Sequence, residues 1–117
     1  MNRVVHFEIN VADPERAAAF YRDVFGWEIT RWGEHEYWLV STGDPGRSGI
    51  DGAIVPARNG APGTINTVQV ESVAEVARAV EAAGGRVTMP ETPIPGVGTV
   101  IYCTDPAGTT FGALQPE

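Results

Sequence analysis

Three polar side chains alternate along the first apolar segment of the chain and are its clearest candidates for chemistry. His6, Glu8 and Asn10 occupy every second position before Val11, so in a strand they share one face. Three polar groups in a row are costly to bury without partners, and we expect them to face water, a ligand or a partner subunit. A carboxylate can orient a neighbouring imidazole and raise its basicity, which makes His6 and Glu8 candidate catalytic acid–base residues. The alternative is a hydrated pocket wall without catalysis.

Two further polar residues occupy a similar strand in the second half of the chain. Thr67 and Gln69 alternate with apolar residues between Ile65 and Val70. Because this strand corresponds to the one that carries His6, we expect its polar side chains to add hydrogen-bonding groups to the same space.

Aromatic residues on a predicted strand could form the wall for a flat organic ligand. Either Trp38 with Val40 or Tyr37 with Leu39 must face the polar side, and the alternation alone leaves the choice open. Taking Trp38 as the aromatic contact, the predicted ligand-binding residues are His6, Glu8, Trp38, Thr67 and Gln69.

The flanking sequence indicates the elements that position these residues. Alternation predicts a strand over 4–11, and Asp13-Pro14 is typical of a helix start, with Asp as the N-cap and Pro in the first turn. Apolar residues at helical spacing form one stripe of this helix, which Gly26 ends. Three more strands are predicted over 27–32, 36–41 and 50–56.

The same order of elements returns in the second half. Aligning Val11 with Val70 gives an offset of 70 − 11 = 59, at which helix starts and breaks coincide. Ser72 can cap the second helix, and Gly84-Gly85 ends it. Strands are predicted over 65–70, 86–89, 99–104 and 109–114, with a proline-rich loop over 90–98. The order is therefore βαβββ twice, and each half needs a partner for the sheet face that its helix leaves open.

Composition and charge limit the possible partners. The 117 residues are 43% hydrophobic and 20% charged, as in ordinary globular domains. A formal net charge of −7 argues against nucleic acid or an anionic membrane as a partner. With a single cysteine, Cys103, no intrachain disulfide can form, and we expect a cytoplasmic protein.

Short motifs stand where these elements meet. They are His6 to Val11 followed by Asp13, Phe20-Tyr21, Phe25-Gly26-Trp27, Glu81 to Gly85 and Asp105-Pro106-Ala107-Gly108. Together with the order of elements, these motifs resemble the vicinal oxygen chelate superfamily, which includes glyoxalase I, extradiol dioxygenases and bleomycin-resistance proteins.

The resemblance covers nearly the whole chain and implies an α+β fold of two βαβββ modules whose curved mixed sheets enclose a cleft. The modules are expected over 1–57 and 64–117, with a linker over 58–63. The resemblance also implies a homodimer.

In metal-using members the resemblance implies ligands on the first and fourth strands of both halves. His6 matches one of these four positions. The other half has Ile65 and Gly112 at the matching positions, and the remaining glutamate falls at or near Gly52, beside Asp51. A catalytic divalent metal needs at least three fixed protein ligands, so we expect no metal and no other cofactor. An atypical divalent metal site is the alternative.

We therefore predict a protein that binds a small organic ligand in its cleft without a catalytic metal. Two alternatives stay open. One is an enzyme (a lyase, isomerase or dioxygenase-like oxidoreductase) that uses His6 with Glu8 as acid and base, or an atypical metal site. The other is a non-catalytic interaction module.

Overall fold

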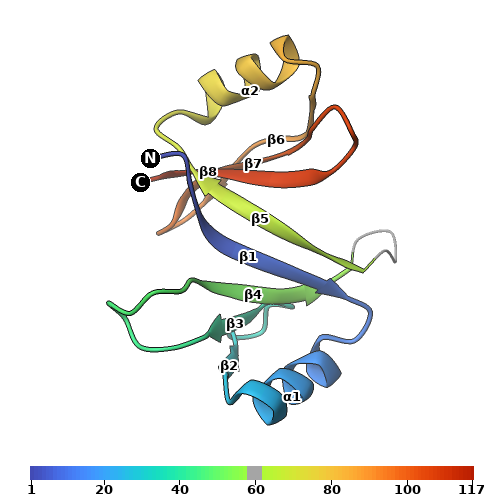
Figure 1. Cartoon of the computed structure of the whole chain (residues 1–117), viewed down its shortest axis with the longest axis vertical. Helices are drawn as coiled ribbons and strands as arrows, with labels where there is room; N and C mark the ends of the chain where they lie inside the picture. Colours follow the sequence, from blue (N-terminus) through green and yellow to red (C-terminus); the bar gives the residue numbers. More distant parts are fainter. Residues whose placement is uncertain (58–61) are drawn as a thin grey trace. The chain divides into compact units, whose positions relative to one another are not determined.

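The computed structural model describes residues 1–57 and 62–117, which form eight strands and two helices (Figure 1). The predicted α+β class and the βαβββ order of each half are confirmed. Most of the predicted linker 58–63 lies outside the described residues. The elements are β1 (Arg3–Val11), α1 (Pro14–Phe25), β2 (Glu28–Arg31), β3 (Trp38–Ser41), β4 (Asp51–Pro56), β5 (Gly63–Gln69), α2 (Val73–Ala82), β6 (Arg86–Ile94), β7 (Gly98–Thr104) and β8 (Thr110–Pro116).

The chain divides into two compact units. The N-terminal module comprises His6–Ile65, and the C-terminal module comprises Asn66–Glu117 together with Met1–Val5. The first five residues join the C-terminal module through the N–H of Asn2, which donates to the carbonyl oxygen of Gln69 at 2.6 Å. Neither described helix is long and apolar enough to cross a membrane.

The sheet of the N-terminal module is mixed, with the order β2-β3-β4-β1. Strand β1 runs parallel to β4, whereas β2, β3 and β4 pair antiparallel. Helix α1 covers one face of this sheet (Figure 1). The core between them contains Ala18, Ile29, Trp38, Val40 and Ile54.

Helix α1 begins and ends as its sequence predicts. The carboxylate of Asp13 accepts a hydrogen bond from the backbone N–H of Arg16 at 3.2 Å, and Pro14 occupies the first turn. At the other end Gly26 adopts a left-handed conformation, with φ of 70°, and its N–H donates to the carbonyl oxygen of Arg22 at 2.9 Å. These caps satisfy backbone groups that the helix itself cannot pair.

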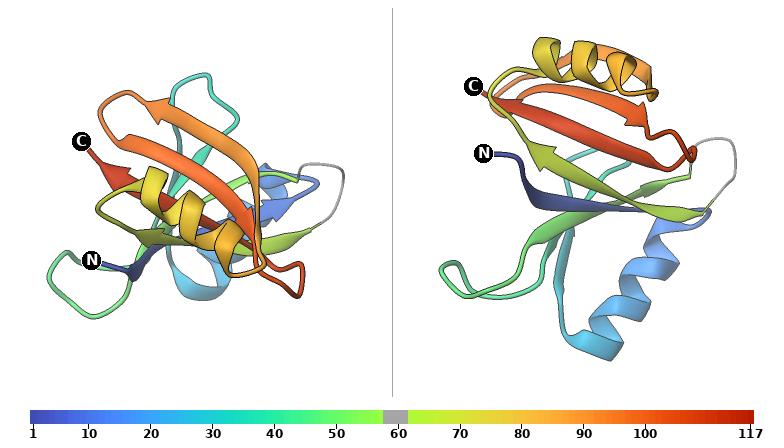
Figure 2. Two further views of the ribbon diagram at one scale, coloured as in Figure 1. Left: turned by 90° about the horizontal axis from the view of Figure 1, so that it is seen from above. Right: turned by 45° about the horizontal axis from the view of Figure 1, so that its top comes forward.

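The C-terminal module repeats this architecture, with the strand order β5-β8-β7-β6 and β5 parallel to β8. Figure 2 shows α2 lying along the strands of this module. Its N-cap, Ser72, accepts from the backbone N–H of Glu75 at 3.2 Å. The core holds Val70, Val73, Ile101, Cys103 and Ala113, so Cys103 is a buried core residue, and burial raises the pKa of its thiol.

Strand β6 is longer than the sequence indicated. The predicted loop over 90–98 is wrong in its first part, because β6 continues through Pro90 and Pro93 to Ile94. Pro93 pairs with Thr99 of β7, and the register shifts twice along the pair. Proline is tolerated here because β6 lies at the edge of its module's sheet, where one side of the strand needs no hydrogen-bond donors.

Strands β1 and β4 pack tightly at Gly52. In the parallel register Phe7 pairs with Gly52 and Ile9 with Ile54. A Cβ atom at position 52 would lie 2.5–2.6 Å from two atoms of the Phe7 ring, and closer still to the Phe7 carbonyl oxygen. Only glycine therefore allows this packing.

Replacing Gly52 with alanine tests that packing. Because the backbone oxygen of Phe7 cannot move aside without disturbing the strand pair, we expect the free energy of unfolding to fall by about 2 kcal/mol or more. Urea denaturation measures the change. Gly43→Ala is the matched control, since a Cβ at position 43 would meet no atom within 4 Å. Equal stability of the two variants would contradict the observed register.

Candidate functional site

The candidate site is built on the face of the N-terminal sheet that α1 does not cover. Strand β1 alternates as predicted: Phe7 and Ile9 pack toward the helix, so His6 and Glu8 project from the opposite side. In the parallel pairing with β4, His6 lies beside Asp51. We call the surface formed by His6, Glu8, Tyr37 and Asp51 the polar face of this module.

The defining contact of the polar face joins two residues 31 positions apart. The hydroxyl of Tyr37 and Nε2 of His6 are hydrogen-bonded at 3.2 Å. Burial lowers the pKa of the His6 imidazole, an effect that the negative charges of Glu8 and Asp51 partly offset. Burial and the charge of Glu8 raise the pKa of Tyr37 to about 12. At neutral pH the site therefore holds a neutral imidazole against a protonated phenol.

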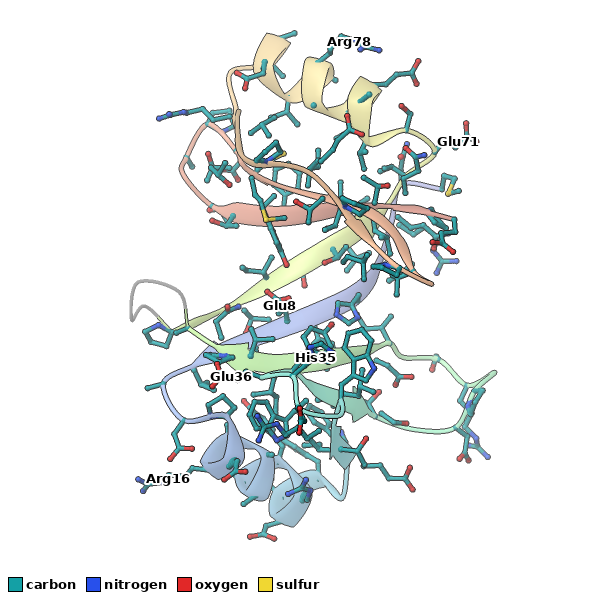
Figure 3. The ribbon with its side chains drawn as sticks, turned by 180° about the vertical axis from the view of Figure 1, so that it is seen from behind. Glu8, Arg16, His35, Glu36, Glu71 and Arg78 are labelled. Atoms are coloured by element: carbon teal, nitrogen blue, oxygen red, sulfur yellow. The ribbon has the colours of Figure 1, made fainter. Side chains whose placement is uncertain are left out.

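Two further aromatic rings lie in the connection between β2 and β3, where Tyr37 is also found. The ring of Trp32 meets that of Tyr37 edge-on, with 5.7 Å between centroids, and lies 4.9 Å from the His35 ring. The backbone N–H of Trp32 donates to the carbonyl oxygen of Tyr37 at 2.9 Å, which closes the hairpin. Figure 3 shows His35 and Glu36 in this connection and Glu8 on β1.

Asp51 is held by the loop that precedes β4. Its Oδ1 accepts a hydrogen bond from the backbone N–H of Thr42 at 2.9 Å, and the Thr42 hydroxyl donates to the carbonyl oxygen of Ile50 at 2.7 Å. Together with Asp51, residues 42–49 line a hollow of about 270 Å³. From the sequence we expect only a connection between the strands predicted over 36–41 and 50–56, because glycine and proline indicate turns but not the space that the turns enclose.

The structure decides between the two aromatic alternatives, Trp38 at the start of β3 and Tyr37 just before it. Trp38 pairs with Ile54, is only 7% exposed and packs in the helix-covered core. The guanidinium of Arg31 lies 5.0 Å from the centre of its ring. Trp38 is therefore a core residue and not part of the polar face, and Tyr37 is the aromatic residue that reaches His6. The prediction that Trp38 contacts the ligand is therefore wrong for the polar face. The sequence alone does not indicate which side of this short strand is buried, because its pairing with β4 decides that.

Thr67 and Gln69 belong to the C-terminal module, so they are not part of the polar face defined above. Thr67 is 6% exposed and pairs with Gly112 of β8, while Gln69 is half-buried. Gly112 also pairs with Tyr102 of β7. A Cβ at position 112 would lie 3.1 Å from the Thr67 hydroxyl oxygen and 3.3 Å from the Tyr102 ring, so this row is tightly packed.

The residues at the positions where the family resemblance implies metal ligands do not fit a metal ion. Gly52 faces the Phe7 ring on the core side, and the space for a side chain at Gly112 is bounded by Thr67 and Tyr102. Over residues 1–57 and 62–117, no three His, Cys, Asp or Glu side chains gather closely enough to hold a metal. Among the described residues, His6 therefore has no set of additional ligands of the kind that a fixed divalent ion requires.

Comparison with known proteins identifies the family. The family model of the Glyoxalase/Bleomycin resistance protein/Dioxygenase superfamily matches residues 3–112 of this chain. The chain is 30% identical to the lactoylglutathione lyase of Haemophilus influenzae, over 91% of this chain and 87% of that protein.

Solved structures agree in fold. Methylmalonyl-CoA epimerase from Mycobacterium tuberculosis has a TM-score of 0.71 at 17% identity, covering 97% of this chain and 87% of its own. A Streptomyces coelicolor methylmalonyl-CoA epimerase in complex with 2-nitronate-propionyl-CoA has a TM-score of 0.70 at 18% identity, covering 97% and 96%. At these identities the likeness concerns the fold. The chain belongs to the Glyoxalase/Bleomycin resistance protein/Dioxygenase superfamily.

Proposed function

We propose that this chain binds a small organic ligand on the polar face of its N-terminal module, without a metal ion. The observation that carries the proposal is the hydrogen bond between the Tyr37 hydroxyl and Nε2 of His6, beside Glu8. The side chains of His6, Glu8 and Tyr37 are polar and half-buried, so a ligand that displaces their water can bind by forming hydrogen bonds with them.

The protonation states of this pair suit hydrogen bonding to a ligand. Because burial keeps the imidazole neutral, His6 can offer one ring nitrogen as a donor or an acceptor. The phenol of Tyr37, with a pKa of about 12, stays protonated at every physiological pH. The family relationship supports a small-molecule ligand, since relatives are named for their action on lactoylglutathione and methylmalonyl-CoA.

Other expectations from the sequence remain part of the proposal. That Thr67 and Gln69 bind a ligand stays a prediction from the sequence. The homodimer and the cytoplasmic location stay predictions.

A second candidate function is acid–base catalysis by His6. A neutral imidazole can take a proton from a substrate, and the nearby charge of Glu8 favours the imidazolium that results. In this reading His6 and Glu8 are the catalytic candidates, Tyr37 positions the ring, and the reaction is of the lyase or isomerase type.

The pKa of His6 is the first test, since both candidate functions need a neutral imidazole. We expect NMR titration of the His6 ring to give a value below 6.5, because burial outweighs the attraction of the carboxylates. Glu8→Gln should lower it further, whereas Glu15→Gln, an exposed change on α1, should leave it unchanged. A His6 pKa at or above 6.5 would contradict this view of the site.

The same shift predicts how stability responds to acid. Between the lowered pKa of His6 and 6.5, the unfolded chain takes up a proton that the folded chain does not, so stability should fall as the pH falls through this range. Urea denaturation at several pH values measures this. The His6→Gln variant should lack that component of the pH dependence.

Ligand binding is tested by an NMR screen of small organic fragments that are cationic, neutral or anionic, supplemented with lactoylglutathione and methylmalonyl-CoA. We expect compounds that shift the His6 and Tyr37 signals of the wild type, with affinity lost in His6→Ala and reduced roughly tenfold in Tyr37→Phe, as for one lost hydrogen bond. An absence of any such compound, or hits that bind both His6→Ala and Tyr37→Phe as tightly as the wild type, would exclude binding at this face.

His6→Ala also separates the two candidates once a ligand is known. Lost turnover with unchanged affinity supports catalysis. A variant that changes neither property supports a non-catalytic interaction module.

A further inference from the structure

We propose that the polar face selects small organic cations, such as protonated amines, and discriminates against anionic ligands such as phosphate and CoA esters. This inference rests on the proposed function and adds the chemical class of the ligand. It follows from where the charges and aromatic rings of the N-terminal module lie.

Carboxylates provide the formal charge of the polar face. Glu8 projects from β1 on the same side as His6, and Asp51 lies beside His6 in the strand register. Their charges act on the rings next to them, since both carboxylates favour the protonated form of His6 and Glu8 raises the pKa of Tyr37. An anionic group placed against these rings would meet two like charges, whereas a cation would meet two opposite ones.

The arginines of the module's described part are placed elsewhere. Arg22 donates to the carbonyl oxygen of Ile29, and Arg31 donates to the carbonyl oxygens of Glu34 and His35 while its guanidinium lies over the Trp38 ring. Arg16 is exposed on α1 and points into solvent, as Figure 3 shows.

Arg47 is the remaining cation among the described residues of the module. It lines the hollow before β4 together with Asp44 and Asp51, so two carboxylates outnumber the guanidinium there. The chain contains no lysine. Apart from Arg47, the described polar face therefore lacks the arginine and lysine contacts that hold phosphate groups in other proteins.

Aromatic rings supply the second element of cation recognition. Trp32 is 43% exposed, and its ring contacts Tyr37, which in turn bonds to His6. Aromatic faces attract ammonium groups within about 6 Å of their centres, and the attraction adds to that of a nearby carboxylate. The combination of Trp32 and Tyr37 with Glu8 thus suits a cation that also carries an apolar body.

The test uses three probes of similar size that differ in charge: benzylamine, benzyl alcohol and benzoate. Binding is measured for each from the NMR shifts of the His6 ring and the Trp32 indole. We expect benzylamine to bind the wild type at least tenfold more tightly than benzoate, with benzyl alcohol between them. Added salt should weaken benzylamine binding and leave benzyl alcohol binding unchanged.

Two variants test the source of the preference. Glu8→Gln should cut the advantage of benzylamine over benzyl alcohol severalfold, and Asp51→Asn should do so while keeping the side-chain oxygen that accepts from Thr42. Glu15→Gln removes one negative charge from α1, across the sheet from the polar face, and should leave the preference unchanged.

The outcomes separate the two proposals. Benzoate binding as tightly as benzylamine, or a preference that survives Glu8→Gln and Asp51→Asn together, would overturn the inference and leave the proposed function in place. If none of the three probes shifts the His6 or Trp32 signals while other fragments do, the inference alone fails. If no fragment of any charge binds, both fail.

Discussion

The Phe7 ring can lie against β4 only because position 52 carries no side chain. This contact fixes the parallel register of β1 on β4, and the register places Asp51 beside His6. A slip of one residue would turn His6 and Glu8 toward α1 and expose Phe7 instead, because strand side chains alternate between faces. The chemistry of one face of the sheet therefore depends on close packing on the other.

Much of this arrangement could be predicted from local sequence. The alternation in β1, the Asp13-Pro14 helix start and the 59-residue repeat are local or periodic signals, and the structure confirms the elements they indicate. The facing of β3 could not be predicted, because each face of the strand predicted over 36–41 carries one aromatic and one aliphatic residue. The pairing of Trp38 with Ile54 decides which side is buried. The length of β6 was underestimated for a different reason: proline is unfavourable within a sheet but tolerated along an edge.

The candidate site lies in a domain of the family's fold, but of the four metal-ligand positions that the resemblance implies only His6 matches. His6 occupies a position that the family resemblance associates with a metal, but Gly112 carries no ligand and its surroundings are filled by Thr67 and Tyr102. What remains near His6 is a phenol and carboxylates, which act through hydrogen bonds and charge. No local motif predicted the contact between His6 and Tyr37, since Tyr37 lies just before β3, a strand that does not pair directly with β1.

His6 and Tyr37 are proposed to hold an organic ligand and not a metal ion. The most direct measurement is a crystal structure of protein purified without chelators or added metals, with anomalous diffraction data collected above and below the zinc and nickel absorption edges. We expect any bound molecule at this face to be organic and to lie within hydrogen-bonding distance of His6 or Tyr37, with no anomalous peak. A metal ion coordinated by His6 would contradict it.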